Sequence, residues 1–160
     1  MSCDAVIVRL KDMTEPRALE QRTADVRRKL ATDVDLWVAS ADAAGAAYLV
    51  PLSFVWHGDT LILATPRASR TARNLLRAGR ARVGLGPTRD VVMVDGPVAE
   101  LSRGADPAAE QAFADAAGFD PRTLPEYLYL RVVPDVIQAW RSPAELPGRT
   151  VMRDGRWLAP

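Results

Sequence analysis

The sequence is poor in the residues that build metal sites and activated nucleophiles. Its 160 residues contain one cysteine and one histidine, Cys3 and His57. A single cysteine cannot form an internal disulfide, which favours a reducing cytoplasm. One histidine excludes a site built from two histidines, and no cysteine or histidine spacing suggests zinc, so we expect no metal. With no nucleophile beside a base, hydrolytic chemistry has no visible machinery.

Long apolar runs and a strong net charge are absent as well. No apolar run approaches the roughly 20 residues that a membrane helix needs, and the charged N-terminus lacks the apolar core of a signal peptide. The formal net charge is +1, so no global field draws the chain to nucleic acid or membrane. The length and the 48% apolar content suit one domain with a buried core. We expect a single soluble, cytoplasmic domain over 1–160.

Lysine is nearly missing, because the 21 basic residues comprise 19 arginines and 2 lysines. A GC-rich genome would produce this bias, so the position of an arginine says more than the number of arginines. Six arginines, with no lysine and no acidic residue, fall between Leu63 and Gly86. The question is whether this stretch binds nucleic acid, binds a phosphorylated cofactor, or forms a solvated surface.

Apolar periodicity and turn residues predict the elements. A helix is expected over about 15–31, with Thr14 as its N-cap and Pro16 in its first turn. The next segments are rich in β-branched and aromatic residues and predict a three-stranded meander over 35–42, 47–57 and 60–66. The rest of the chain predicts a helix over 69–80, strands over 81–88 and 90–101, a helix between Asp106 and Gly118, a strand over 127–141 interrupted at Pro134, and a C-terminal arm over about 142–160.

This order of elements predicts a mainly β fold with added helices. About six strands, with helices inserted between them, suggest a closed or partly closed antiparallel barrel. The helices would cover the open ends of the barrel.

A cluster of hydroxyl and guanidinium groups lies where the third strand gives way to the next helix. Its members are Thr65, Arg67, Ser69, Arg70 and Arg73. The first N–H groups of a helix lack partners and its dipole is positive there, so an anion is stabilised. Arginine binds phosphate oxygens bidentately. The cluster therefore predicts a phosphate site, although Ser69 is also explained as an ordinary N-cap.

The later arginines allow a simpler interpretation. Arg77, Arg80 and Arg82 fit the solvated face of a surface helix and its continuation, unless the ligand carries a long acidic tail. Nucleic acid is the competing ligand. Single-strand binders interleave basic residues with aromatics, and none lies between Trp56 and Phe113.

Two further features bear on a site. Pro51 inside a strand cannot donate a ladder hydrogen bond, so that strand is expected to be locally at an edge or a bulge, beside the small Ser53. Trp140 near the C-terminus is able to cover a cofactor ring, while His57 is expected at an exposed hairpin tip. The missing catalytic machinery favours a cofactor that brings its own reactivity.

The segment from Asp35 to Arg141 resembles the pyridoxamine 5′-phosphate oxidase-like split-barrel flavoproteins. The resemblance rests on "VPLSFVWHGDTLILAT", on the helix that Ser69 opens, and on "RDVVMVDGPVAEL". The matching positions are Pro51, Leu52, Ser53, Phe54, Gly58, Asp59, Leu61, Thr65, Ser69, Arg73, Arg82, Val83 and Leu85. The final strand, "LRVVPDVIQAWR", is similar to the last strand of the family, which commonly ends in an aromatic residue.

The resemblance implies a six-stranded antiparallel split β-barrel that forms a homodimer, with the cofactor between subunits. It implies FMN as cofactor, or alternatively the deazaflavin coenzyme F-420, which carries an acidic polyglutamyl tail. The phosphate would lie at Thr65, Arg67, Ser69, Arg70 and Arg73. The isoalloxazine edge would meet the second strand at Val50, Pro51, Leu52 and Ser53, and Trp140 remains a candidate to cover the ring.

Departures from the family pattern narrow the function. The usual G-x-P is Gly45-Ala46-Ala47 here, an arginine replaces the lysine of the phosphate motif, and residues that recognise pyridoxamine phosphate are not evident. The sequence therefore predicts an oxidoreductase that moves a hydride between the cofactor and another small organic substrate. The catalytic acid is unknown, with Ser53 and Tyr127 as candidates. The alternatives are a non-enzymatic flavin or haem storage protein and a nucleic-acid binder.

Overall fold

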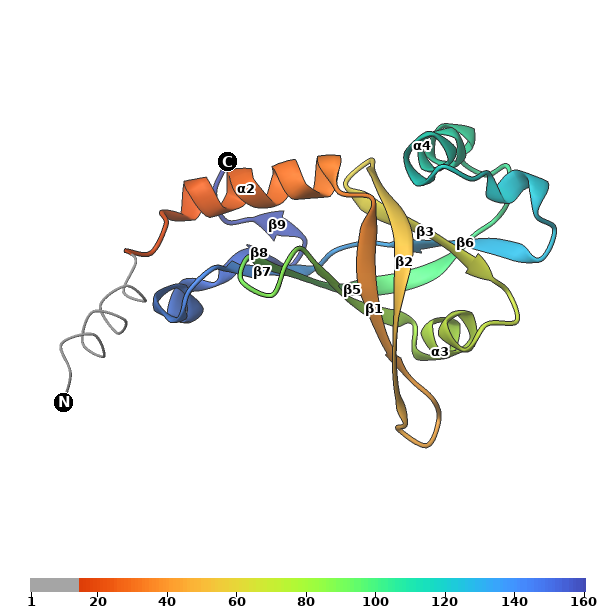
Figure 1. The fold of residues 1–160 in the computed structure, drawn as a ribbon, viewed down its shortest axis with the longest axis horizontal. Helices are drawn as coiled ribbons and strands as arrows, with labels where there is room; N and C mark the ends of the chain where they lie inside the picture. Colours follow the sequence, from red (N-terminus) through yellow and green to blue (C-terminus); the bar gives the residue numbers. More distant parts are fainter. Residues whose placement is uncertain (1–14) are drawn as a thin grey trace, which may run out of the picture.

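The computed structural model describes residues 15–160 (Figure 1), so the predictions for Cys3 and Thr14 lie outside the described residues. The strands are β1 (Asp35–Ala41), β2 (Ala47–His57), β3 (Thr60–Pro66), β4 (Arg80–Leu85), β5 (Val91–Leu101), β6 (Tyr127–Val132), β7 (Val136–Trp140), β8 (Thr150–Arg153) and β9 (Arg156–Trp157). The helices are α2 (Leu19–Thr32), α3 (Arg70–Ala78), α4 (Pro107–Ala117) and the short 3₁₀ turns η1 (Pro121–Thr123) and η2 (Pro143–Gly148).

Six of these strands close a barrel. The sheet runs in the order β4-β1-β2-β3-β6-β5, and a further pairing of β4 with β5 joins its two ends. Every pairing is antiparallel, and β7, β8 and β9 extend the sheet beyond β5. The predicted six-stranded antiparallel barrel is confirmed, and the predicted C-terminal arm forms η2, β8 and β9.

Local chemistry explains where several elements end. The β2–β3 turn places Gly58 and Asp59 at φ values of 54° and 58°, as a type I′ turn requires. Ser69 accepts a hydrogen bond from the backbone N–H of Ala72 at 3.0 Å, so it caps α3 as predicted. Gly79 ends that helix in the left-handed region, with φ 67°. Because Gly86 also has a positive φ, β4 stops before the predicted limit of 88.

The first described helix begins later than the sequence predicts. α2 starts after Ala18, which makes no side-chain capping bond, and not at Pro16. The reason is a long-range contact: the backbone N–H and the guanidinium of Arg17 both bind Glu145, at 3.0 and 2.8 Å. These bonds hold Arg17 against η2 and so keep it out of the first helical turn.

Two apolar clusters organise the packing. The barrel interior forms the main core, to which α2 contributes Val26 and Leu30 and α3 contributes Ala72 and Leu75. The second cluster lies between α4 and the outer face of β3, β6 and β5, and its fully buried rings are those of Phe113 and Tyr129. In Figure 1, α3 lies at the lower right, near the β1–β2 hairpin, and α4 lies at the upper right. Among residues 15–160, no helix has both the length and the apolar character needed to cross a membrane.

Candidate functional site

The barrel is split along one edge of β2. Residues 47–53 of β2 pair with β1, whereas residues 54–57 pair with β3. The β2–β3 ladder begins at Phe54 opposite Leu63, so the two strands diverge on the other side of that pair. Within the described part of the chain, no strand pairs with the β3-facing edge of residues 47–53. This open edge presents backbone groups that a ligand can bind.

The hydrogen bonds between β1 and β2 determine which residues direct their backbone groups to the open edge. Phe54 donates its backbone N–H to the carbonyl of Val34 at 2.8 Å, on the β1 side. Because alternate residues of a strand direct their N–H and C=O groups to opposite edges, Leu49, Pro51 and Ser53 face the open edge. Pro51 pairs with Trp37 of β1, and the pairing with β3 begins only at Phe54. This confirms the sequence prediction that this part of the strand lies at an edge, where the missing N–H of proline costs no ladder bond.

The first turns of α3 lie beside the start of this open edge, because Ala47 and Tyr48 of β2 line one hollow together with Arg70 and Arg73. Thr65 is 3% exposed, and its hydroxyl lies 3.2 Å from the hydroxyl of Ser69. The first turn of α3 contains no acidic residue, so nothing in it neutralises the positive end of the helix dipole. Two of the predicted phosphate residues, Thr65 and Ser69, are therefore in contact at a helix N-terminus.

A polar hollow of about 280 Å³ lies between α3 and the tip of the β1–β2 hairpin. Its lining residues are Asp42, Ala46, Ala47, Tyr48, Arg70, Arg73 and Asn74. The guanidinium carbon of Arg70 lies 5.7 Å from the centre of the Tyr48 ring, and Arg73 donates to the carbonyl of Ala68. Neither arginine forms an ion pair with a carboxylate of residues 15–160. The hollow is thus lined by two arginines that are not ion-paired and by one carboxylate, Asp42.

The carboxylate at the same hollow is turned toward the hairpin backbone. Asp42 accepts hydrogen bonds from the N–H groups of Ala44 and Ala46, at 2.9 and 3.0 Å, through one oxygen. This arrangement holds the hairpin turn. It leaves Arg70 and Arg73 to face the hollow.

Of the five predicted phosphate residues, Arg70 and Arg73 line the hollow, whereas Thr65, Ser69 and Arg67 do not. Arg67 has a partner of its own. Its guanidinium binds Glu100 of β5 with two bonds of 2.6 and 3.0 Å. The hydrogen bonds from Arg67 lower the pKa of Glu100, which outweighs the opposing effect of burial. Arg67 therefore ties the β3–α3 corner to β5.

The remaining predicted residues are dispersed. Val50 and Leu52 pack against the main core. The hydroxyl of Ser53 donates to Asp35 at 2.8 Å. Trp140 ends β7 and pairs with Val91 at the start of β5, whereas Arg80, just after α3, pairs with Pro97 toward the other end of β5.

Tyr127, a candidate catalytic acid, has its ring 5.8 Å from that of Phe119 in the cluster beneath α4. Tyr127 thus lies outside the hollow, and its role as a catalytic acid stays a prediction. His57 ends β2 at the hairpin, at the opposite end of that strand from the tip of the β1–β2 hairpin.

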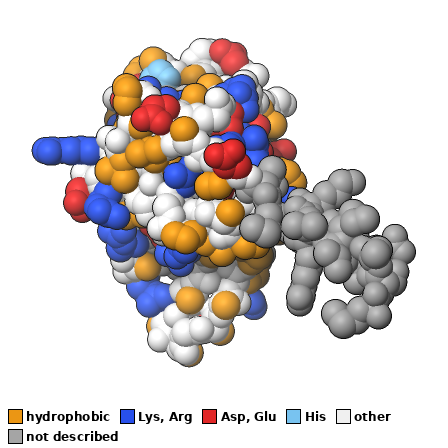
Figure 2. All heavy atoms as spheres, turned by 90° about the vertical axis from the view of Figure 1, so that its left-hand side faces the viewer, with side chains coloured by type: hydrophobic (Ala, Val, Ile, Leu, Met, Phe, Trp, Pro, Cys, Tyr) orange, Lys and Arg blue, Asp and Glu red, His pale blue; other side chains and the backbone are white. Residues whose placement is uncertain are grey.

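The later arginines have intramolecular partners, which the sequence did not reveal. Arg80 binds Asp135 at 2.9 Å, and Arg82 binds Asp95 at 2.6 Å. Arg77 donates to the backbone carbonyl of Ala41 at 2.6 Å. On the face shown in Figure 2, acidic side chains lie in the upper half and basic side chains occur in both halves.

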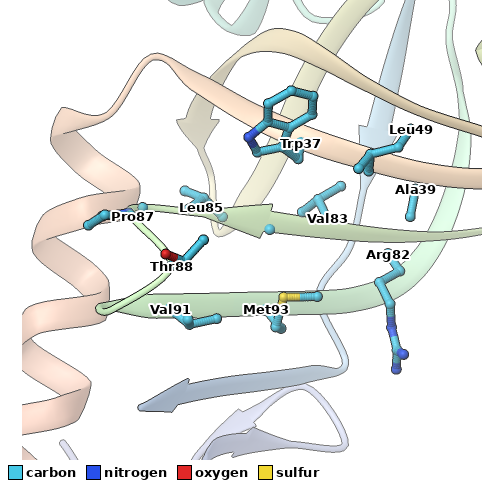
Figure 3. Close-up of a pocket in the computed structure, with 12 residues that line it drawn as sticks. Trp37, Ala39, Leu49, Arg82, Val83, Leu85, Pro87, Thr88, Val91 and Met93 are labelled. Carbon is cyan, nitrogen blue, oxygen red and sulfur yellow. The ribbon is translucent and has the colours of Figure 1, made fainter. Parts of the chain in front are cut away.

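An apolar groove that the sequence analysis missed lies on the outer face of β1, β4 and β5 (Figure 3). It encloses about 210 Å³. Trp37 and Leu49 border it with 52% and 59% of their surface exposed. Gly84 lies opposite both Trp37 and Met93, and its missing side chain leaves room between them. The exposed strand residues that line the groove occupy positions that point away from the barrel interior. Only the register of those strands shows that these positions lie side by side.

Comparisons with known proteins agree with this architecture. The profile of the pyridoxamine 5′-phosphate oxidase family matches residues 23–141, and the chain belongs to this family. None of the curated proteins matches the chain.

Several solved structures share the fold. A heme binding protein from Mycobacterium smegmatis is 15% identical with a TM-score of 0.66, over 89% of this chain and 60% of that one. General Stress Protein 26 from Bacillus anthracis is 14% identical with a TM-score of 0.56, over 76% of this chain and 93% of that one. An F420 reductase is also 14% identical with a TM-score of 0.58, over 69% of this chain and 94% of that one.

Proposed function

We propose that this protein binds FMN in the split beside β2 and acts as an oxidoreductase on a small organic substrate. One observation carries the proposal: the open edge of residues 47–53 begins at the hollow that Arg70 and Arg73 line at the start of α3. A strand edge suits a ring with polar atoms along one side, and the arginines suit a phosphate.

The residues present fit the phosphate end of such a cofactor. Arg70 and Arg73 would hold the phosphate oxygens in the polar hollow, with the N-terminus of α3 adding its positive dipole. The contact between Thr65 and Ser69 fixes the hydroxyl that caps this helix. Binding a dianion here would neutralise two cations that have no carboxylate partner in residues 15–160.

The open edge would orient the ring. Leu49 and Ser53 offer backbone N–H and C=O groups there, while Pro51 offers a carbonyl. FMN, when bound, supplies the hydride transfer. The protein supplies binding and orientation, and we assign no catalytic acid.

The arrangement supports FMN ahead of coenzyme F-420. An acidic polyglutamyl tail would need free arginines beyond the phosphate, but Arg80 and Arg82 are paired with aspartates. The F420 reductase of similar fold keeps F-420 as the alternative. Haem is supported less, because His57 lies at the β2–β3 hairpin and outside the hollow.

We further propose that a second copy of the chain covers the apolar groove. Leu49 borders this groove from the strand whose other edge is open, so a partner seated there would lie beside the cofactor. Arg82 is the charged residue among those that line the groove, and it is already paired with Asp95, so no unpaired charge opposes the self-complementary contact of two copies. An exposed apolar groove next to a site is typical of an interface.

The proposal is tested by purifying the full chain, recording its visible absorption, and titrating it separately with FMN, coenzyme F-420 and haem. We expect saturable, tight binding of FMN and quenching of its fluorescence. Failure to bind either flavin would overturn the proposal. Salt-dependent binding of oligonucleotides without flavin binding would favour the nucleic-acid alternative instead.

A further inference from the structure

Side chains of α3 hold the β1–β2 hairpin from one side. The amide of Asn74 donates to the hydroxyl of Ser40 at 3.1 Å, and Arg77 donates to the carbonyl of Ala41 at 2.6 Å. Asn74 is 7% exposed, so this contact is formed inside the protein. Arg70 adds its contact with the ring of Tyr48.

The hairpin tip depends on these contacts. Pairing of β1 with β4 ends at Ala39 opposite Arg82, and pairing of β2 with β3 ends at Phe54. The tip is therefore a two-stranded ribbon, which projects past α3 in Figure 1. A two-stranded ribbon is marginally stable by itself, so its position is set by what it packs against.

That position determines the shape of the polar hollow. Tyr48, with Asp42, Ala46 and Ala47, lines it from the hairpin, whereas Arg70, Arg73 and Asn74 line it from α3. A shift of the hairpin relative to α3 would widen the hollow and draw the Tyr48 ring away from Arg70.

We propose that Arg77 and Asn74 are positioning residues, which hold the hairpin on α3 and keep the hollow at the size that takes a phosphate group. This inference rests on the proposed function of the hollow. It assigns Arg77 an intramolecular contact with the hairpin, in place of a contact with an acidic cofactor tail.

The experiment compares FMN with riboflavin, which lacks the phosphate, as ligands of the full chain. Arg77→Met removes the bond to Ala41. The apparent Kd for FMN rises in proportion as the fraction of molecules with the hairpin in place falls. If this fraction falls to about a tenth in Arg77→Met, we expect FMN binding to weaken about tenfold. Riboflavin binding should stay unchanged, since the riboflavin part meets the β2 edge. Arg77→Lys keeps a donor for the Ala41 carbonyl and should restore FMN binding.

Arg80→Met is the matched control, because it removes the same charge near the end of α3 but its partner is Asp135. An unchanged ratio of FMN to riboflavin affinity in Arg77→Met, or an equal loss in Arg80→Met, would overturn the inference. A loss that affects polyglutamylated F-420 but not FMN would overturn it too.

Hydrogen exchange separates this inference from the proposed function. The N–H of Asp42 bonds the carbonyl of Ala46 across the hairpin turn at 3.1 Å. Exchange of this N–H should accelerate in Arg77→Met and not in Arg80→Met, even if the wild type binds no flavin. Unchanged exchange in Arg77→Met would refute the positioning role whatever the ligand is.

Discussion

The ammonium group of Lys29 binds Asp90 twice, at 2.9 Å to its backbone carbonyl and at 2.8 Å to its carboxylate. Arg141 holds the other carboxylate oxygen at 2.9 Å. Gly86 packs against the backbone of Asp90 and has a φ of +78°. A Cβ atom added at Gly86 would lie 2.5 Å from the carbonyl oxygen of Asp90. The turn that ends the apolar groove is therefore tied to α2 and to the C-terminal segment, and a side chain at Gly86 would disturb both contacts.

Replacing Lys29 with methionine should lower the free energy of unfolding by about 1–3 kcal/mol, since a partly buried carboxylate loses one of two cationic partners. Burial alone raises the pKa of Asp90, but hydrogen bonds from Arg141 and Lys29 outweigh it and lower that pKa. The variant should therefore also raise the pKa of Asp90. Urea unfolding and an NMR titration check the two results. Arg28→Met, which removes a 60% exposed arginine, should cost less.

Glu145 should make the protein sensitive to acid. Its carboxylate accepts four hydrogen bonds from Arg17 and Arg141. The side-chain bond from Arg17 is the largest cause that lowers its pKa, from 4.5 to about 2, against the opposing effect of burial. A lowered pKa gives stability that is present above the unfolded value and is lost as pH falls through the folded value.

The variant Glu145→Gln isolates this contribution. At pH 7 it should be less stable than the wild type by on the order of 2–3 kcal/mol. The difference should shrink between pH 4.5 and about 2, as measured by urea unfolding across that range. A difference that stays constant with pH would contradict the assignment to Glu145.

The double variant Arg70→Ala and Arg73→Ala should weaken FMN binding on the order of 100-fold, because each guanidinium makes charge-assisted hydrogen bonds to phosphate. Riboflavin binding should hardly change. Fluorescence titration measures both. Arg67→Ala is the control, because Arg67 is occupied by Glu100 outside the hollow. Equal losses for FMN and riboflavin would place the phosphate elsewhere.

Placing a carboxylate in the apolar groove should separate the proposed dimer. Trp37→Glu should shift the protein toward monomer in sedimentation experiments, since a charge cannot be buried there without a partner. Val133→Glu changes another exposed apolar side chain, 48% exposed and outside the groove, and should leave the assembly unchanged. A monomeric wild type would rule out the second copy as occupant of the groove.

Local sequence patterns predicted the parts of this fold that local chemistry decides. Helix α3 begins after Ser69, whose hydroxyl caps it, and ends at Gly79, which adopts the left-handed conformation. Long-range partners could not be predicted in this way. Glu100 takes Arg67 out of the expected phosphate cluster because barrel closure brings β5 beside the start of α3. The groove at Trp37 likewise depends on the register of three strands.

An unpaired strand edge is also a place where a second molecule can add a strand. The edge of residues 47–53 carries four outward backbone positions, Ala47, Leu49, Pro51 and Ser53, and Pro51 withholds its donor between Leu49 and Ser53. A regular ladder cannot form across that gap, although a ring with a few polar atoms can still use the donors on either side. The residue that leaves the site open to a small ligand thus also protects the free protein against growth into a longer sheet.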